Sequence, residues 1–513
     1  MSIADRLRKL TPARLLGMRR GIEKESLRAL PGGTLALTPH PGALGSPLTH
    51  PNITTDYSES QLELITGVHA ETESCLDELT RIHQFTCRTL AAAGGERLWA
   101  GSMPCGLPTD ETIPLGRYGG SHIGRAKSIY RMGLGHRYGR RMQMISGIHY
   151  NWSLPGLSND EHFALIRNFR RHSFLLLWLF GASPAVCASF VAGRDHGLRP
   201  LAEGTLYLPH ATSLRMGRLG YQSDAQGRLS VSYNSLENYA ASLQEALTRP
   251  YPPYEAIGVR NLGGEYNQLS TALLQIENEF YGTIRPKRVI RSGERPLHAL
   301  RDRGVEYIEV RCMDLDPFVP VGIASASMRF IDIFLLHCLL HDSPPDTPDE
   351  IAALGRNQHR TAAFGREPGL ELERGGKAAR LIDWAAEIVE QSSPIAAALD
   401  AAHGGNAYSQ ALAEARRSLA APDSLPSARV LSAMQRDFAG SHINFTSARA
   451  EATRSHILGL PWPADAQAAF DALAQRSLAE HAAIEAADKV DFETFRQAYL
   501  APEGLLVEAL DAA

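Results

Sequence analysis

The sequence predicts an α+β fold in which a mixed, largely antiparallel sheet carries the chemistry and helices pack around it. Two observations lead to this prediction. The first half of the chain is interrupted by Gly and Pro and holds short apolar runs of strand length. After about residue 325 the chain becomes rich in Ala, Leu, Glu and Arg, which favour helices. We therefore expect one catalytic unit over 1–513, with a sheet-bearing core over 1–340 and a mainly helical part over 341–513 packed on it.

The expected elements follow in order along the chain. Short apolar runs between turn residues predict strands at 19–27, 61–66, 145–154, 273–281 and 305–313. Helical spacing or composition predicts helices at 77–93, 160–180, 236–248, 325–341, 382–402, 409–420 and 464–500. The three prolines within 342–348 mark the clearest break, either a domain boundary or a long loop.

Composition and charge exclude several classes of protein. The 513 residues are 44% hydrophobic and 21% charged, as in an ordinary globular protein, which excludes a mainly disordered chain. The 52 basic residues against 56 acidic ones give a net charge of −4, which argues against a dedicated nucleic-acid binder.

No targeting or membrane segment is expected. The N-terminus lacks the apolar stretch of a signal peptide, and the most apolar span, 174–193, is broken by Gly181, Ser183 and Pro184. The cysteines are widely spaced without a C-x-x-C pair, so we expect reduced thiols in a cytoplasmic protein. They are Cys75, Cys87, Cys105, Cys187, Cys312 and Cys338.

Carboxylates are spaced so that they share a strand face. Residues two apart on a strand point the same way, so Glu23 pairs with Glu25, and Glu309 with Arg311. Asp56 and Glu63 flank a loop that leads into a strand, and His149 lies within another strand. For any single pair, the plainer interpretation is a solvated sheet face.

The joint pattern indicates a cation site. Apolar residues fill the opposite face of these strands, so the acids, His149 and Arg311 would share one surface. Clustered like charges repel one another, which calls for a positive group among them. Oxygen ligands with one imidazole suit Mg²⁺ or Mn²⁺, and an arginine on that face suits phosphoryl charge.

A basic stretch at 117–141 leaves three interpretations open. Its arginines and interleaved tyrosines are compatible with nucleic-acid binding, with capture of an anionic substrate, or with a solvated helix face. The spacing Gly119-x4-Gly124-Arg125 is not a P-loop, because Arg replaces the required Lys and no Ser or Thr follows.

Several long motifs, in one order, resemble the proteobacterial glutamate–cysteine ligase (γ-glutamylcysteine synthetase) family. The resemblance is specific over about 15–340 and looser beyond it, where 427–434 matches best. The motifs are GIEKESLR (21–28), LTHPNITTDY (48–57), ISGIHYNWS (145–153), FGASPA (180–185), QIENEFYGTIRPKR (275–288) and GVEYIEVR (304–311).

The resemblance implies a glutamine-synthetase-like fold, with an antiparallel sheet lining a funnel for ATP, metal ions and two amino acids. It implies a two-step, ADP-forming reaction that opens glutathione biosynthesis. ATP phosphorylates the γ-carboxylate of L-glutamate, and the amine of L-cysteine then displaces phosphate. A carboxylate is a poor electrophile, and phosphorylation supplies a leaving group, so cations are needed to bring the anionic reactants together.

The resemblance also implies roles for individual residues. The metal ligands would be Glu23, His149 and Glu309 facing ATP, and Glu25, Asp56 and Glu63 nearer the acceptor. Arg311, His149 and Glu309 would be catalytic, and Arg311 would clamp the phosphoryl group. From the basic segment at 280–288, we expect Arg285 and Lys287 to assist the ATP phosphates. Arg215 would contact an amino-acid substrate, and the cysteine pocket would comprise Tyr57, Tyr130, Arg131, Tyr221 and Tyr281.

The expected partners are therefore glutamate, cysteine and ATP, with glutathione as a feedback inhibitor, and neither nucleic acid nor membrane. Relatives imply a monomer. Three alternatives remain open: a ligase of this fold with another amine acceptor, a nucleic-acid binder acting through 117–141, and a regulatory protein that has lost catalysis. The intact acids, His149 and Arg311 argue against the last.

Overall fold

The structure is a computed structural model that describes residues 3–220, 224–227, 229–291 and 293–506. Its main sheet has the strand order β2-β3-β1-β5-β10-β9, with β4 paired to β1, and every pairing is antiparallel. These strands are β1 (Arg19–Ala29), β2 (Ile53–Thr55), β3 (Gln61–Ile65), β4 (Arg97–Leu98), β5 (Ile148–Ser153), β9 (Ile284–Lys287) and β10 (Tyr307–Met313). A small sheet contains β6 (Ala185–Cys187), β7 (Arg199–Ala202) and β8 (Thr205–Tyr207), and a hairpin contains β11 (Glu371–Arg374) and β12 (Lys377–Arg380).

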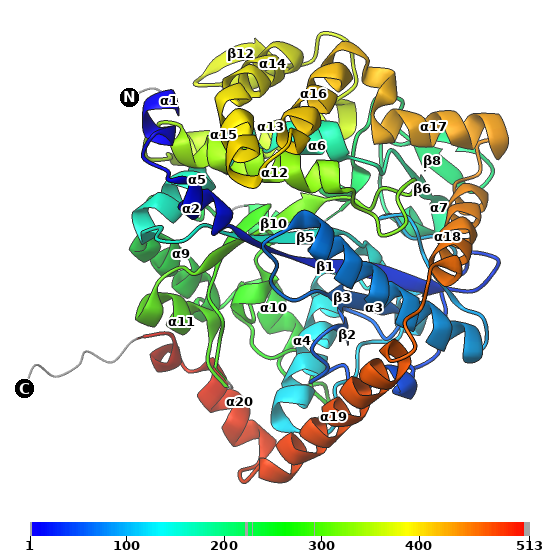
Figure 1. The fold of residues 1–513 in the computed structure, drawn as a ribbon. Helices are drawn as coiled ribbons and strands as arrows, with labels where there is room; N and C mark the ends of the chain where they lie inside the picture. The colour runs from blue at the N-terminus through cyan, green and yellow to red at the C-terminus, as the bar shows by residue number, and fades with distance from the viewer. Residues whose placement is uncertain (1–2, 221–223, 228, 292, 507–513) are drawn as a thin grey trace, which may run out of the picture.

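Helices surround the sheet (Figure 1). Those before residue 341 are α1 (Ile3–Leu7), α2 (Pro12–Leu16), α3 (Thr72–Ala92), α4 (His122–Tyr138), α5 (Asn159–His172), α6 (Phe174–Phe180), α7 (Ala188–Val191), α8 (Asp224–Gly227), α9 (Leu236–Thr248), α10 (Pro252–Ile257), α11 (Pro296–Arg303) and α12 (Ser325–Leu340). Those after it are α13 (Pro348–Phe364), α14 (Leu381–Gln391), α15 (Ser393–His403), α16 (Ala407–Ala420), α17 (Pro426–Asp437), α18 (His442–Gly459), α19 (Ala466–Ala487) and α20 (Phe492–Leu500). None of the helices described is long and apolar enough to cross a membrane.

The two faces of β1 have different partners. Ile22 is fully buried in the core, and Arg20 on the same face forms an ion pair with Asp332 of α12 at 2.9 Å. Because side chains alternate along a strand, Glu23 and Glu25 point to the opposite face. One face of the sheet is therefore packed against helices, and the other carries the acids.

The predicted strands near residues 19, 61, 145 and 305 are confirmed, but the one at 273–281 is wrong. That segment contains only a 3-10 turn (Glu277–Glu279), and the strand is β9, a few residues later. β9 is an edge strand, and its Pro286 fits there because an edge position does not require every backbone N–H to be paired.

Three predicted long helices are each two helices. The span 160–180 breaks at Ser173 between α5 and α6, and 382–402 breaks at Ser392 between α14 and α15. The span 464–500 breaks after Ala487, and α20 starts anew from the side-chain cap of Asp491. Helix-favouring composition does not reveal such breaks, because each lasts only one to a few residues.

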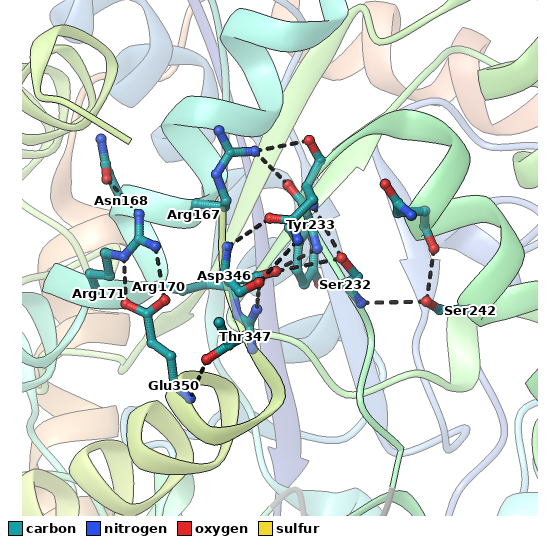
Figure 2. Close-up of polar contacts among 12 residues, drawn as sticks. Arg167, Asn168, Arg170, Arg171, Ser232, Tyr233, Ser242, Asp346, Thr347 and Glu350 are labelled. Atoms are coloured by element: carbon teal, nitrogen blue, oxygen red, sulfur yellow. Dashed lines mark hydrogen bonds and ion pairs between the residues drawn. The ribbon is translucent and has the colours of Figure 1, made fainter. Parts of the chain in front are cut away.

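The proline-rich segment 342–348 is a loop fixed to the core by a polar network (Figure 2). Asp346 accepts a hydrogen bond from Arg170 of α5 at 3.2 Å and one from the backbone N–H of Tyr233 at 3.4 Å. Arg171 donates two hydrogen bonds to Glu350 in the first turn of α13, at 2.7 and 2.9 Å. The network ties the start of the helical part to α5 and to the loop before α9.

The cysteine prediction is wrong for two residues. Cys105 and Cys187 form a disulfide across a sequence separation of 82 residues. The other four, Cys75, Cys87, Cys312 and Cys338, are free and buried. Because 82 residues separate the two partners, their proximity is a product of the fold and is not visible as a local motif.

Candidate active site

Strand register brings the predicted acids together. Glu23 of β1 is paired with His149 of β5, and Glu25 of β1 with Glu63 of β3. Glu309 of β10 is paired with Asn151, two residues beyond His149. Residues opposite each other in an antiparallel pair share a face, so three neighbouring pairings place these side chains on one surface.

His149 lies at the centre of the cluster. Its Nδ1 is 3.1 Å from Glu23 Oε2 and 3.6 Å from Glu309 Oε1, and its Nε2 is 3.7 Å from Glu25 Oε1. One ligand atom each from Glu23, Glu63 and His149 lie within 4.8 Å of one another. Glu63 thus groups with Glu23 and His149, and Glu25 and Glu309 also lie near His149, so the two sets that the resemblance implied adjoin each other.

Two positively charged side chains, Arg311 and Lys287, border the cluster on the β9–β10 side. Arg311 Nη1 is 3.0 Å from Glu309 Oε1 and 3.4 Å from His149 Nδ1. Lys287 Nζ is 3.5 Å from the same oxygen of Glu309, and its side chain remains 30% exposed. The pair therefore presents positive charge beside the acids.

The acids titrate differently according to their neighbours. Burial raises the pKa of Glu25 to about 8, and the charge of Asp56 adds to this effect. Burial together with the charges of Glu23, Asp56 and Glu25 raises the pKa of Glu63 well above its usual range. Burial also opposes ionisation of Glu309, but Arg311, Lys287 and His149 outweigh it and hold its pKa well below the usual range.

The cluster fits a divalent cation. The buried Oε2 of Glu309 has no hydrogen-bond partner among the described residues. Burial, with a further contribution from Arg311, lowers the pKa of His149, so its ring is neutral near pH 7, as a metal ligand must be. Carboxylate oxygens with one imidazole are a donor set that Mg²⁺ and Mn²⁺ both accept.

Asp56 occupies the turn between β2 and β3, beside α4. Its carbonyl oxygen accepts hydrogen bonds from the Tyr118 hydroxyl at 2.8 Å and from Arg131 Nε. The Arg131 guanidinium also lies over the Tyr118 ring, 4.4 Å from its centroid. These contacts join the turn that contains Asp56 to α4, the helix that also carries Tyr130.

Tyr57 and Tyr281 both lie near α4, the first beside Gly135 and the second beside the ring of Tyr138. Tyr57 is 2% exposed, and its buried hydroxyl has no hydrogen-bond partner among the described residues. A Cβ atom on Gly135 of α4 would lie 2.7 Å from that hydroxyl, so glycine is required there. The Tyr281 hydroxyl accepts a hydrogen bond from Gln143 Nε2 at 2.9 Å. Tyr221 lies outside the described residues.

Arg215 lies directly beneath the acidic face. It is 1% exposed, donates to the carbonyl oxygen of Arg311 at 2.9 Å, and approaches Asp314 to 3.9 Å. A Cβ atom on Gly147 would lie 2.0 Å from its Nη2, so the glycine makes room for the guanidinium. The charge of Arg215 also opposes the rise in the pKa of Glu25.

A cavity of about 320 Å³ opens at the edge strand β9. Arg285 and Lys287 line it together with apolar side chains from α9 and α11. Arg285 donates to the carbonyl oxygens of Asn278 (2.8 Å) and Phe280, and Lys287 reaches Glu309. The cavity and the acidic cluster are therefore neighbours across Lys287.

Two polar residues of the site were missed by sequence reasoning. Asn151 donates to Glu23 Oε1 at 2.9 Å, and Gln143 orients Tyr281. Alternation along a strand puts Asn151 on the same face as His149, although no role was predicted for it. Gln143 lies in a 3-10 turn, and no sequence spacing links it to Tyr281.

The basic stretch 117–141 makes its contacts inside the molecule. Arg137 forms a buried ion pair with Glu279 at 2.8 Å, and Arg125 lies over the Phe492 ring at 4.2 Å. Arg140 donates to the carbonyl oxygen of Ile113 at 2.8 Å. These contacts favour a structural role over a free cationic stripe.

Comparisons with known proteins point to one family. The family model for glutamate-cysteine ligase matches residues 6–361. A glutamate–cysteine ligase from Azotobacter vinelandii is 48% identical over 505 residues, covering 94% of each chain, and one from Pseudomonas aeruginosa (strain PAO1) is 48% identical over 508 residues with the same coverage.

Solved structures show the same fold. The crystal structure of glutamate–cysteine ligase from Francisella tularensis in complex with AMP has a TM-score of 0.90 and 33% identity, covering 96% of this chain and 99% of that one. A bifunctional glutathione synthetase from Pasteurella multocida has a TM-score of 0.70 and 25% identity; the match covers 93% of this chain and 58% of that one. This chain belongs to the glutamate–cysteine ligase family.

Proposed function

We propose that the acidic face of the sheet is the catalytic centre at which this ligase joins the γ-carboxylate of L-glutamate to the amine of L-cysteine. A γ-carboxylate oxygen attacks the γ-phosphorus of ATP, ADP leaves, and γ-glutamyl phosphate forms. The cysteine nitrogen then attacks the acyl carbon, phosphate leaves, and an amide remains. The product feeds glutathione biosynthesis.

The observation that carries this proposal is the convergence of four carboxylates, one imidazole and Arg311 on one face through strand register. A solvated sheet face does not require buried, mutually repelling acids. Because Glu25 is buried, Glu63 is half-buried and both are disfavoured as anions, the arrangement is costly unless a cation is present.

Mg²⁺ or Mn²⁺ is the cation that we propose for this cluster. The residues that would hold it are Glu23, Glu25, Asp56, Glu63, His149 and Glu309. When bound, the metal would neutralise the charge of the ATP phosphates as they approach the glutamate carboxylate. Asn151 would fix the orientation of Glu23 through its hydrogen bond.

The phosphate-facing cations are Arg311, Lys287 and Arg285. Arg311 is held against Glu309, so its guanidinium is positioned before substrate arrives and loses little side-chain freedom on binding. Lys287 lies between the acidic cluster and the β9 cavity, which suits contact with a polyphosphate spanning both. Arg285 is tied to backbone carbonyls and would support that strand.

The β9 cavity is our candidate for the nucleoside of ATP. Its volume, about 320 Å³, is in the range of small-ligand pockets. Leu243, Val289, Leu297 and Leu300 supply apolar surface for a base, and the cations lie at the side nearest the cluster.

The amino-acid substrates would occupy the side bordered by α4. Tyr57, Tyr130, Arg131 and Tyr281, with Tyr221, form our proposed cysteine pocket. Tyrosine rings offer a narrow slot with polar edges that suits a small thiol side chain. Arg215 would act on the α-carboxylate of glutamate, for which a guanidinium fork is well matched.

ADP release tests the proposed function. Purified protein would be given Mg·ATP and glutamate, with cysteine, with the thiol-free acceptor 2-aminobutyrate, or with neither. We expect release that depends on either acceptor. Glutamate-dependent release that ignores both would assign another amine as acceptor, and no release under any condition would contradict the catalytic assignment.

Glutathione is the proposed feedback inhibitor, because it contains both the γ-glutamyl and the cysteinyl groups that the two pockets would recognise. We expect inhibition that is competitive with glutamate; a glutathione effect independent of glutamate concentration would contradict it. We further propose a monomer that works in the cytoplasm, where its co-substrate ATP is available.

A further inference from the structure

The last part of the chain crosses the end of the molecule beneath α4. Figure 1 shows α19 and α20 as a V-shaped pair there, in orange and red. We call residues 466–505 the C-terminal arm; it comprises α19, α20 and the 3-10 turn Pro502–Leu505. The arm lies beyond the residues that the family model matches.

Beyond Phe470, which stacks on Phe85 of α3 at 4.8 Å, the arm contacts the loop before β2. Ser477 accepts a hydrogen bond from the backbone N–H of Ser46 at 2.9 Å through its hydroxyl, and one from the Thr49 hydroxyl at 2.5 Å through its carbonyl. His481 Nδ1 lies 2.7 Å from the Ser46 hydroxyl. This loop leads into β2 and the turn that carries Asp56.

Two carboxylates of the arm then bind the start of α4. Glu485 accepts a hydrogen bond from the backbone N–H of Gly120, and Asp488 accepts one from that of His122 at 2.6 Å. The first N–H groups of a helix lack partners within the helix, and the helix dipole favours negative charge there. Ser121 is the N-cap of α4, and its hydroxyl accepts from the Gly124 N–H. Asp488 adds a bond to the first helical residue, His122, and Glu485 adds one to Gly120 just before the cap, so the arm supplements the cap of α4 from a distant part of the chain.

Close packing supports the same attachment. Gly119 has a φ of +81°, and a Cβ atom there would lie 1.9 Å from His481 Nε2. The His122 ring makes a second bond, 2.6 Å from Nε2 to the carbonyl oxygen of Val490. A side chain at residue 119 would therefore push the arm away from α4.

Phe492 of α20 continues the contact along α4 as far as the proposed cysteine pocket. It is 5% exposed and forms a cluster with Ala126 and Leu269, against which Tyr130 also packs. Gln275 links this cluster to Tyr130: its Oε1 accepts a hydrogen bond from the Leu269 N–H at 2.9 Å, and its Nε2 donates one to the Tyr130 carbonyl oxygen at 3.2 Å.

We propose that the C-terminal arm is a positioning element for the cysteine pocket, acting by supplementing the cap of α4 through Glu485 and Asp488 and by supporting Tyr130 through Phe492. The proposal rests on the assignment of Tyr130 and Arg131 to that pocket. None of the arm residues named approaches the acidic cluster in the contacts described, so the expected effect falls on acceptor binding.

The test compares Glu485→Ala/Asp488→Ala with Glu485→Gln/Asp488→Asn in the full-length chain. The amide variant keeps an oxygen that accepts the Gly120 and His122 N–H groups. The control is Glu480→Ala, an exposed carboxylate on α19 paired only loosely with Arg476 at 3.7 Å. KM for cysteine, glutamate and ATP would be measured by ADP release, and amide hydrogen exchange over 118–127 would report on the cap.

We expect the alanine pair to raise KM for cysteine about fivefold, the effect of losing a helix cap, and to leave KM for glutamate within about twofold. Exchange over 118–127 should quicken, the amide pair should restore most of the loss, and the control should match the parent. An unchanged KM for cysteine, or an equal rise in all three KM values, would overturn the proposal.

Tyr130→Ala separates this proposal from the one on which it rests. If Tyr130→Ala leaves KM for cysteine unchanged, the pocket assignment fails. If Tyr130→Ala raises it and the alanine pair does not, only the role of the arm fails. Should the alanine pair not fold, Phe492→Leu provides the same comparison with a smaller change at the cluster.

Discussion

Glu309 is the acid on which the most cationic contacts converge. It is 1% exposed, with Arg311 and Lys287 at 3.0 and 3.5 Å from one oxygen and its second oxygen unpartnered among described residues. Glu309→Gln would remove one negative charge while keeping size and shape. We expect a loss of roughly 10²–10³-fold in metal-dependent turnover with the fold intact.

The measurement is ADP release against Mn²⁺ or Mg²⁺ concentration, with circular dichroism to check folding. Glu306→Gln is the matched control, since Glu306 is exposed on the same segment. Activity near that of the parent enzyme in Glu309→Gln would remove this residue from the metal site.

Tyr281 tests the acceptor pocket at the same scale. Tyr281→Ala would delete a ring that faces Tyr138 edge-on at 5.6 Å, and we expect KM for cysteine to rise about tenfold or more, with a much smaller change for glutamate. Tyr281→Phe keeps the ring and loses only the hydroxyl held by Gln143, so its effect should be smaller. Equal rises for both substrates would show that Tyr281 is not a wall of the cysteine pocket.

Apart from Asp56, which lies in a turn, the site residues that the sequence pattern alone reached are on strands. Alternation alone relates Glu23 to Glu25 and Glu309 to Arg311, and it also places Asn151. Arg215 was named only by resemblance, and its burial beneath Gly147 depends on how a 3-10 turn packs against β5 and β10. Contacts between segments far apart in the chain, such as Gln143 with Tyr281, carry no local signal.

At the scale of elements, one buried ion pair joins β1, α12 and β5. Asp332 is fully buried, pairs with Arg20 at 2.9 Å, and accepts from the Tyr150 hydroxyl at 2.8 Å. Asp332→Ala would leave the Arg20 charge buried and unpaired. We expect the free energy of unfolding to fall by about 3–5 kcal/mol, measured by urea denaturation.

Removing both charges distinguishes pairing from packing. Arg20→Met/Asp332→Leu should lose clearly less stability than Asp332→Ala, because no uncompensated charge remains. If the double variant is as unstable as the single one, the ion pair is not what links these elements.

Helices and strands were predictable where apolar residues recur with a single helical or strand period. β10 alternates between polar and apolar residues over 307–312, and α9 and α12 begin and end within a residue of their predicted bounds. β9 was misplaced because it has only four residues and contains a proline, which argues against a strand by sequence alone. The junction between α19 and α20 was missed because flanking helix formers conceal it.

The whole molecule contains features that no local pattern encodes. The Cys105–Cys187 disulfide and the return of the C-terminal arm to α4 both join segments separated by many elements. Composition predicted that the last part of the chain is helical. It did not predict which elements those helices contact, because that depends on the path of the whole chain. Sequence reasoning therefore reaches elements, a resemblance and the shared acidic face, but not these two long-range contacts.

Several buried histidines make the stability of the whole molecule depend on pH. Burial lowers the pKa of each, to about 4 for His40, His50, His359 and His442 and to about 3 for His337. Neighbouring arginines add to the effect on the first three. In the unfolded chain these rings titrate near 6.5. Between the folded and unfolded values the unfolded state binds more protons, so the stability is fully present above pH 6.5 and is lost as the pH falls.

The pH effect of the buried histidines is best tested at one residue, His337, because groups with raised pKa values oppose it in the whole molecule. The raised pKa of Glu25 works in the opposite direction, so the pH profile of the parent protein alone is a sum of both. His337 is fully buried on α12 between the rings of His172 and His341, at 5.4 and 5.5 Å, with the charge of Glu387 only partly offsetting the burial. Neither of its ring nitrogens has a hydrogen-bond partner within the described part of the chain.

We expect His337→Leu to fill the same apolar space and to remove one titrating group. Urea denaturation from pH 7.5 to 4.5 should show a shallower decline than in the parent, by up to about 1.4 kcal/mol per pH unit below 6.5, and parallel curves above it. The exposed His456→Leu serves as the control for replacing a histidine. Curves that stay parallel down to pH 4.5 would mean that His337 binds its proton equally in both states, and that burial at the α12 interface does not keep this ring neutral.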